Sequence, residues 1–162
     1  MTGSQSFGES FKVYNNHQRV VAQFQYTDTQ KDSYPSITIE LAPLAGTDAN
    51  WQAKSSVQLT RYELTLFTRV LFGLTPLAEG AYHGTNRNKG FRLQHNGPDG
   101  VSLTVSEGGQ VQQIMFNPQE RIEVGSFVIR RLAMGWQMAV ADVLALLRQS
   151  AMLERQPRPP SQ

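Results

Sequence analysis

The side chains that could do chemistry in this sequence are basic, flat and amide groups, not paired acids or nucleophiles. The basic candidates for phosphate contacts are Lys12, Arg19, Lys54, Arg87, Lys89 and Arg92, and Gln52 adds an uncharged donor. The flat side chains are Tyr14, Tyr26, Tyr34, Trp51, Tyr82 and Phe91, of which Tyr14, Tyr26, Trp51 and Phe91 are the stacking candidates. Single-stranded nucleic acid binds to a cationic track that carries flat side chains for the bases. The set therefore indicates a nucleic-acid-binding surface as one candidate function.

A structural explanation of the same residues stays open. Every half-buried strand has a polar face, and aromatic side chains in strands usually pack in a core. Trp51 lies in a run where it would share a face with Val57 and Leu59. The pattern alone therefore allows Trp51 to be either a stacking residue or a core residue.

The familiar catalytic and metal-binding patterns are missing from the sequence. There is no cysteine, which excludes disulfides, thiolate metal sites and cysteine nucleophiles. His17, His83 and His95 lack the spacing of a metal site, and no nucleotide-binding or nucleophile-elbow motif occurs. The basic, glycine-bounded segment 84–90 lacks the Gly-Lys-Ser/Thr order of a phosphate loop, so we expect a polar turn there. We therefore predict that the protein is not an enzyme and binds neither a metal nor a cofactor.

The composition indicates a weakly charged, amide-rich surface. Charged residues make up 17% of the 162 residues and the net charge is +2, whereas about 25% charged residues is usual. Residues 82–162 hold nine basic and six acidic groups, against six and seven in residues 1–81. Glutamine, asparagine, serine and threonine must form much of the polar surface, and such a surface makes hydrogen bonds without a strong charge preference.

The first half of the chain predicts strands followed by a helix. Alternation places strands at 11–14, 20–26 and 37–41, a loop at 43–50, and a further strand over 51–59. Thr60 and Glu63 have the spacing of a capping box, which predicts a helix that begins after Thr60. Gly73 and Pro76 should end that helix.

The second half repeats this plan. Strands are predicted at 89–95, 101–106 and 110–116, with Glu107-Gly108-Gly109 as a hairpin turn. Asn117, Pro118 and Glu120 predict the start of a helix. The apolar pattern from Ile122 to Leu153 is too long for one helix, and we expect a break at Gly135. The apolar character of 139–147 predicts a helix that packs on more than one side and hence a subunit interface.

The predicted organisation is one domain over residues 10–153 of α+β class, with two antiparallel sheets of about four strands, each followed by a helix. Residues 1–9 and 154–162 hold too little apolar surface to fold, so we expect both to be disordered. We see no apolar run long enough to cross a membrane, no secretory leader and no transit peptide, and we expect a cytoplasmic, bacterial protein.

Several short motifs occur together in an order that resembles the Whirly family of single-stranded DNA-binding proteins. These are Leu41-Ala42-Pro43-Leu44-Ala45-Gly46, Trp51-Gln52-Ala53-Lys54, and Val57-Gln58-Leu59-Thr60-Arg61-Tyr62-Glu63. His83 and the basic loop after it, the 101–105 strand, and Met134-Gly135-Trp136 follow in the same order. The resemblance covers residues 10–137. One segment differs, because the family's Lys-Gly-Lys-Ala-Ala-Leu segment corresponds here to residues 15–21, where Arg19 alone keeps a fixed charge.

The resemblance implies a Whirly/PC4-like fold, a homotetramer with the helices at its centre, and single-stranded DNA bound along the sheets with little sequence preference. It also implies a role in replication, recombination, repair or transcription, in a bacterial or phage relative of the family.

Our leading hypothesis is a non-enzymatic single-stranded DNA-binding protein. The alternative is an oligomeric scaffold that binds RNA or a protein partner through the same sheet surfaces. An enzyme with a site formed only in the folded chain is the third possibility.

Overall fold

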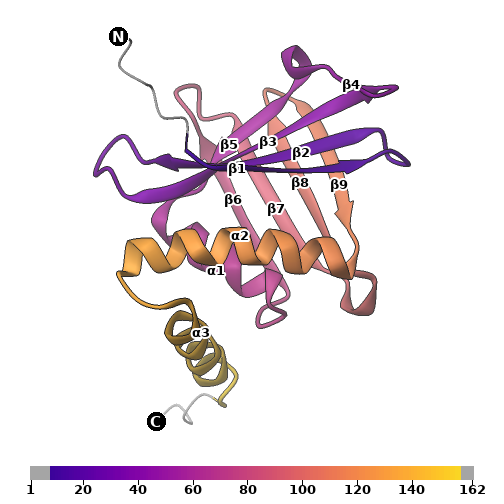
Figure 1. The fold of residues 1–162 in the computed structure, drawn as a ribbon. Helices are drawn as coiled ribbons and strands as arrows, with labels where there is room; N and C mark the ends of the chain where they lie inside the picture. The colour runs from indigo at the N-terminus through magenta and orange to yellow at the C-terminus, as the bar shows by residue number, and fades with distance from the viewer. Residues whose placement is uncertain (1–7, 158–162) are drawn as a thin grey trace.

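The computed structural model describes residues 8–157, which form two antiparallel sheets and three helices (Figure 1). Sheet 1 contains β1 (Ser10–Asn15), β2 (Val20–Asp28), β3 (Pro35–Ala45), β4 (Asp48–Ala49) and β5 (Ser55–Gln58), paired in the order β1-β2-β3-β4 with β5 also on β3. Sheet 2 contains β6 (Leu77–His83), β7 (Lys89–His95), β8 (Val101–Glu107) and β9 (Gln110–Phe116), paired in chain order. The helices are α1 (Arg61–Leu71), α2 (Pro118–Trp136) and α3 (Val140–Glu154). The predicted fold class is confirmed.

Both predicted capping boxes are present. Thr60 Oγ1 accepts a hydrogen bond of 3.2 Å from the Glu63 backbone N–H, and the Glu63 carboxylate accepts one of 2.9 Å from the Thr60 backbone N–H. Asn117 and Glu120 make the same reciprocal pair at 2.8 and 3.0 Å, with Pro118 as the first residue of α2. Each pair satisfies two backbone donors that a helix start leaves free, so both start positions follow from local chemistry.

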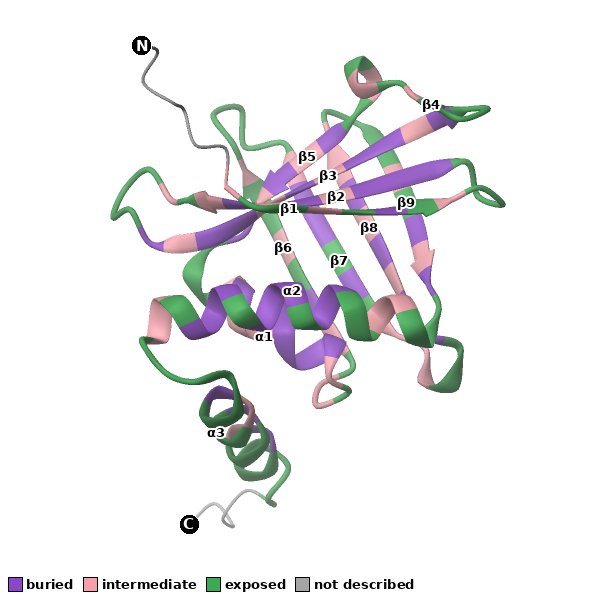
Figure 2. Ribbon diagram, viewed as in Figure 1, coloured by how far each residue is buried: buried purple, intermediate pink, exposed green. Residues whose placement is uncertain are grey.

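One hydrophobic core joins the two sheets and the helices (Figure 2). Phe24 of β2 lies at the meeting point, with its ring centre 6.4 Å from that of Phe67 in α1 and 5.9 Å from that of Phe116 in β9. Phe67 in turn contacts Phe91 of β7 at 6.0 Å. Because these rings link sheet 1, α1 and sheet 2, neither half of the chain has a separate core.

Four segments differ from the sequence-based prediction. β3 continues through the expected loop to Ala45, because its end pairs with β2 and β4. Residues 51–53 form a short 3-10 helix, and only Ser55–Gln58 of the expected 51–59 strand is extended. β6 was not predicted, because its sequence has no apolar alternation and its pairing with β7 defines it.

The fourth difference is the position of the helix break. α2 runs past Gly135 and ends at Trp136, where Gln137 adopts the left-handed conformation at φ 55°. Gly135 serves a packing role instead, since a Cβ on it would lie 2.6 Å from the Tyr34 hydroxyl oxygen. The glycine therefore permits close contact between α2 and the loop before β3.

The two ends of the described chain are held by ion pairs. Glu9 lies 2.9 Å from Arg130 of α2, and its backbone oxygen accepts a hydrogen bond from Tyr26. Glu154 is the last residue of α3 and receives two hydrogen bonds of 2.8 Å from Arg69 of α1. The expected disorder at residues 9 and 154 is therefore wrong, because each carboxylate has an arginine partner. Residues 1–7 and 158–162, where we also expected disorder, lie outside the described residues.

Within residues 8–157, none of the helices is both long and apolar enough to span a bilayer.

Candidate nucleic-acid interface

The outer face of sheet 1 carries three rows of side chains that no α-helix covers, although Trp51 packs over Val21 and Ala42 in one of them. All three helices lie on the opposite, inner side of this sheet (Figure 1). Side chains directly opposite each other in an antiparallel pair share a face, so the strand register defines the rows. The rows are Tyr14-Val21-Ala42, Lys12-Gln23-Glu40-Ser56, and Ser10-Gln25-Thr38-Gln58. This surface is rich in uncharged hydrogen-bonding groups.

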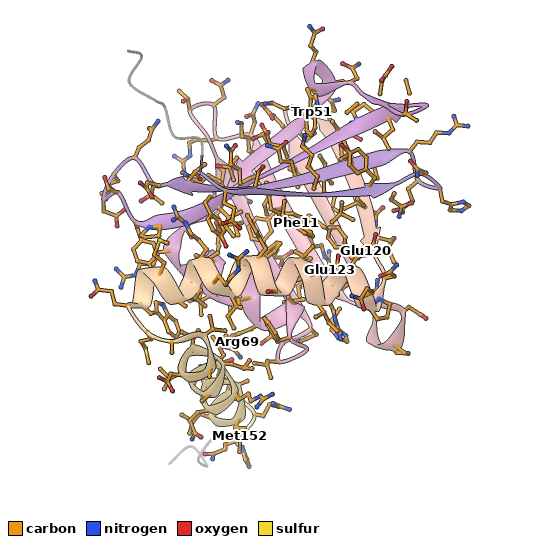
Figure 3. All side chains as sticks on the ribbon, in the orientation of Figure 1. Phe11, Trp51, Arg69, Glu120, Glu123 and Met152 are labelled. Atoms are coloured by element: carbon orange, nitrogen blue, oxygen red, sulfur yellow. The ribbon has the colours of Figure 1, made fainter. Side chains whose placement is uncertain are left out.

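Trp51 lies on this outer face and not in the main core (Figure 3). It packs, half-buried, against a separate small cluster formed by Val21, Ala42 and Leu44. The Lys12 ammonium lies 5.4 Å from the centre of the Trp51 ring. The short 3-10 helix removes Trp51 from the Val57 face, so Trp51 packs on the small outer cluster and not in the core with Val57 and Leu59. The ring is thus half-buried beside a fixed positive charge.

Three further predicted residues surround Trp51. Tyr14 on β1 keeps 50% of its side chain exposed and occupies the row that crosses Val21. Arg19 lies exposed in the β1–β2 turn with φ 57°, and its backbone oxygen accepts from the Leu44 N–H. Gln52 is exposed in the 3-10 helix beside Trp51. We name the surface formed by Lys12, Tyr14, Trp51 and the three rows the sheet 1 platform.

Lys54 lies at the platform, but its positive charge is paired with a carboxylate. Its ammonium contacts the Glu40 carboxylate, and Glu40 is the one acidic side chain in the three rows. The Lys54 end of this pair is exposed, whereas the Glu40 side chain is largely buried, and surface ion pairs contribute roughly 0–1 kcal/mol. A phosphate could therefore compete for Lys54 at small cost.

The predicted cations of the second half lie along β7 and the loop before it. Arg87 is exposed in that loop, and Arg92 is exposed on the outer face of sheet 2, opposite Glu79 and Thr104 in the register. Lys89 lies 3.6 Å from Glu107 of β8. These three residues form a second group on a different sheet from the platform.

Contacts between β5 and the β8–β9 hairpin join the two groups. The Glu107 carboxylate accepts a hydrogen bond of 2.9 Å from the Ser56 N–H, and the Gln110 side chain donates one of 2.7 Å to the Ala53 oxygen. Ser56 belongs to the Lys12 row. Glu107 thus contacts both Lys89 and the edge of the sheet 1 platform.

Tyr26 was predicted as a stacking residue, and this prediction is wrong. Its side chain is 9% exposed, its ring centre lies 4.2 Å from that of Phe127, and its hydroxyl donates to the Phe127 backbone oxygen. Burial raises the pKa of its phenol above the ordinary value of 10.0. Tyr26 shares the Phe24 face of β2, which points into the core.

The stacking prediction for Phe91 is wrong for the same reason. Phe91 is 5% exposed and packs in the core between Phe67 and His83. The neighbouring His83 imidazole lies 2.8 Å from the Glu63 carboxylate, which also caps α1. Phe91 is therefore a core residue that supports the loop carrying the cations, and the small part of it that stays exposed lines a pocket between β6, β7 and β8.

Two cations near these groups escaped sequence reasoning. Lys31 lies exposed in the β2–β3 loop, and Arg61 lies exposed at the start of α1, with its guanidinium carbon 4.6 Å from the centre of the Tyr34 ring. Neither residue lies in an alternating strand pattern. They come near the other cations only because the β2–β3 and β6–β7 loops lie beside the start of α1 in the folded chain. Within the described part of the chain, no three His, Cys, Asp or Glu side chains gather as a metal site would require.

The fold is similar to two solved structures. WHY1 from Arabidopsis thaliana superimposes with a TM-score of 0.60 at 17% identity, over 95% of this chain and 98% of that one. MRP1/MRP2 from Trypanosoma brucei superimposes with a TM-score of 0.55 at 13% identity, over 78% of this chain and 92% of that one. No protein-family model matches the chain, and no curated protein matches it. The chain therefore has a Whirly-like fold, as the sequence resemblance implied.

Proposed function

We propose that this protein binds single-stranded DNA with little sequence preference and performs no catalysis. The observation that carries the proposal is the sheet 1 platform, an uncovered sheet face on which Lys12 lies over Trp51 beside the half-exposed Tyr14. Stacking on an aromatic side chain is worth about 1–3 kcal/mol per base and is open to every base. In a duplex the base faces are already stacked, so the platform suits unpaired strands.

The uncharged rows of the platform support weak sequence preference. Gln23, Gln25 and Thr38 can hydrogen-bond to phosphate and sugar oxygens, and such contacts position a strand without reading its bases. Fixed positive charge comes from Lys12, with Arg19 in the neighbouring turn. The cations of β7 and its loop extend this charge onto the second sheet.

The likeness in fold to nucleic-acid-binding Whirly proteins supports the general part of the proposal, which is nucleic-acid binding. The Whirly resemblance of the sequence implies single-stranded DNA binding, and the observed fold is the one that this resemblance requires. A role in replication, recombination, repair or transcription follows from the same resemblance and belongs to the proposal, as does a cytoplasmic, bacterial location.

We further propose a homotetramer assembled through the helices. Exposed apolar side chains gather on α2 and α3 at Met134, Val140, Leu146, Met152 and Leu153. These helices lie on the side of sheet 1 away from the platform (Figure 1). Assembly through them therefore leaves the platform free for DNA.

A fluorescence-anisotropy titration tests the proposed function. Labelled oligo(dT), the matching duplex and oligo(rU) are titrated with the protein at low salt. We expect oligo(dT) to bind far more tightly than the duplex. Stronger binding of oligo(rU) would favour the RNA scaffold, and no binding of any oligonucleotide would refute nucleic-acid binding.

A further inference from the structure

A pocket of about 350 Å³ lies where β6, β7 and their loop meet β8. Tyr82 lines it, with 73% of its side chain exposed and a backbone φ of 63°. The β6–β7 register shifts between Gly80 and His83, which brackets Tyr82. Positive φ is rare for a bulky residue, and a bulge re-aims the side chain that it carries. The chain thus holds an exposed aromatic ring at the mouth of this pocket by a strained local backbone.

Close backbone packing shapes the same pocket. A Cβ on Gly80 would lie 1.9 Å from a Glu63 carboxylate oxygen, and a Cβ on Gly90 would lie 2.8 Å from the Gly80 oxygen. Both residues line the pocket, and neither position accepts a side chain without displacement of a neighbour. At these two glycines the pocket lining is backbone, and Gly80 lies next to the Glu63 carboxylate that caps α1.

A second pocket, of about 660 Å³, lies between the β2–β3 loop, the end of β5, the start of α1 and the β6–β7 loop. Lys31, Arg61 and Lys89 line it, and Lys89 also lines the first pocket. Gln58 lines it too and belongs to the Ser10-Gln25-Thr38-Gln58 row of the platform. Lys89 is thus common to both pockets, and Gln58 borders both the second pocket and the sheet 1 platform.

The charge of the two pockets is strongly one-sided. Each is lined by three cations and they share Lys89, which gives five cations in all, while Asp32 is the single acid in either lining. The Asp32 carboxylate is engaged by the Thr29 hydroxyl. The other four cations are Lys31, Arg61, Arg87 and Arg92, and among residues 8–157 no carboxylate oxygen lies within 4.0 Å of their side-chain nitrogens. Unpaired cations around two adjoining pockets that share a lysine are suited to a chain of phosphates.

We propose that the two pockets form one groove, centred on Lys89, that holds consecutive nucleotides of the single strand as it leaves the sheet 1 platform. Lys31 and Arg61 contact phosphates in the larger pocket, and Tyr82 stacks on a base in the smaller one. The inference rests on the proposed function and extends it by Lys31 and Arg61, which sequence patterns did not select, and by Tyr82, a flat side chain that was not among the four stacking candidates. It also explains the strained backbone at Tyr82, since stacking needs a ring that stands free of the sheet.

Substitutions in the groove test this proposal in the anisotropy assay. Tyr82→Ala should weaken oligo(dT) binding about 5- to 150-fold, the value of one stacked base. Tyr82→Phe keeps the ring and should bind like the wild type. A Lys31→Gln, Arg61→Gln double variant should lower the slope of log affinity against log salt by about 0.7 for each lost phosphate contact. Tyr62→Ala and Arg148→Gln are matched controls, because both residues are exposed on helices and line neither pocket.

A photo-crosslink gives a direct readout that does not depend on affinity. Wild-type protein is irradiated with an oligo(dT) that carries 5-iododeoxyuridine, and the crosslinked peptide is identified by mass spectrometry. A crosslink at Tyr82 supports the groove. If Tyr82→Ala and the double variant bind like the wild type while Trp51→Ala binds weakly, the groove is refuted and the proposed function stands. If the wild type binds no oligonucleotide, both fail.

Discussion

The Lys12 ammonium lies 5.4 Å from the centre of the Trp51 ring, on a sheet face that no helix covers. A cation at that distance from an indole face is attracted by the ring's quadrupole, with about 0.5–1 kcal/mol at an exposed site. The pair holds a positive charge and a flat ring side by side. These are the two groups that an unpaired strand requires, one for its phosphate and one for its base.

Removal of the Trp51 ring should weaken DNA binding without unfolding the protein. Trp51 packs only on the small outer-face cluster, so Trp51→Ala leaves the main core intact. We expect oligo(dT) affinity to fall about 5- to 150-fold, as measured by anisotropy. Tyr62→Ala, which removes an exposed ring from α1, is the control. Equal losses in both variants would contradict a specific stacking role for Trp51.

Neutralisation of Lys12 should change the salt dependence of binding. If Lys12 contacts a phosphate, Lys12→Gln should reduce the slope of log affinity against log salt by about 0.7. The measurement is a set of titrations at increasing salt concentration. Arg148→Gln on α3 removes a comparable exposed charge far from the platform and should leave the slope unchanged.

Substitution of Tyr26 should affect stability and not binding. Its buried hydroxyl donates to the Phe127 backbone oxygen, so Tyr26→Phe leaves that oxygen without its partner and should cost about 1 kcal/mol in the free energy of unfolding. Urea denaturation at fixed protein concentration measures this. The folded variant should bind oligo(dT) like the wild type. A loss of affinity with unchanged stability would restore Tyr26 as a contact residue.

The Arg69–Glu154 pair should make the docking of α3 depend on pH. The hydrogen bonds from Arg69 lower the pKa of Glu154 below its ordinary value of 4.5. A carboxyl whose folded-state pKa is lowered contributes stability above its unfolded pKa and loses it as pH falls through the folded value. Glu154→Gln should therefore be less stable than the wild type at neutral pH, and this difference should shrink below pH 4.5. Urea midpoints of both proteins across this range supply the test, and a difference independent of pH would contradict it.

Charged substitutions on α3 should disrupt the proposed tetramer. Leu146→Lys with Met152→Lys places two ammonium groups on the exposed apolar side of the helix, and burial of an unpaired charge is costly. Light scattering coupled to size exclusion should show smaller species. Val111→Lys, an exposed apolar position on β9, is the control and should leave the mass unchanged. A wild type that is already monomeric would refute the tetramer.

Local signals predicted much of the fold. Thr60 with Glu63 and Asn117 with Glu120 gave two correct helix starts, because a capping box is satisfied within four residues. The sequence of β6 (Leu77–His83) contains no local pattern that predicts a strand. Its extended conformation is defined by pairing with β7. A glycine in an apolar run predicts a helix break at Gly135, but α2 ends one residue later, and the missing side chain of Gly135 permits contact with Tyr34.

The candidate site could be predicted only in part. Lys12 and Tyr14, which strand alternation marked as binding candidates, and Trp51, which the flat-residue composition marked, lie together on the platform. Tyr26 and Phe24 are two residues apart in β2, so strand alternation alone predicts that both point into the core. The stacking prediction for Tyr26 disregarded that alternation. Lys31 and Arg61 are far apart in sequence and meet only across a pocket, which no local pattern reveals.

Trp51 fluorescence tests the central claim most directly. Trp51 and Trp136 are the two tryptophans of the chain, and Trp136 packs against the core on α2. A Trp136→Phe variant therefore reports on Trp51 alone when oligo(dT) is added. We predict saturable quenching of Trp51 emission with the same midpoint as the anisotropy titration. Unchanged Trp51 emission while the oligonucleotide binds would show that the strand lies elsewhere, and would contradict the sheet 1 platform as the binding surface.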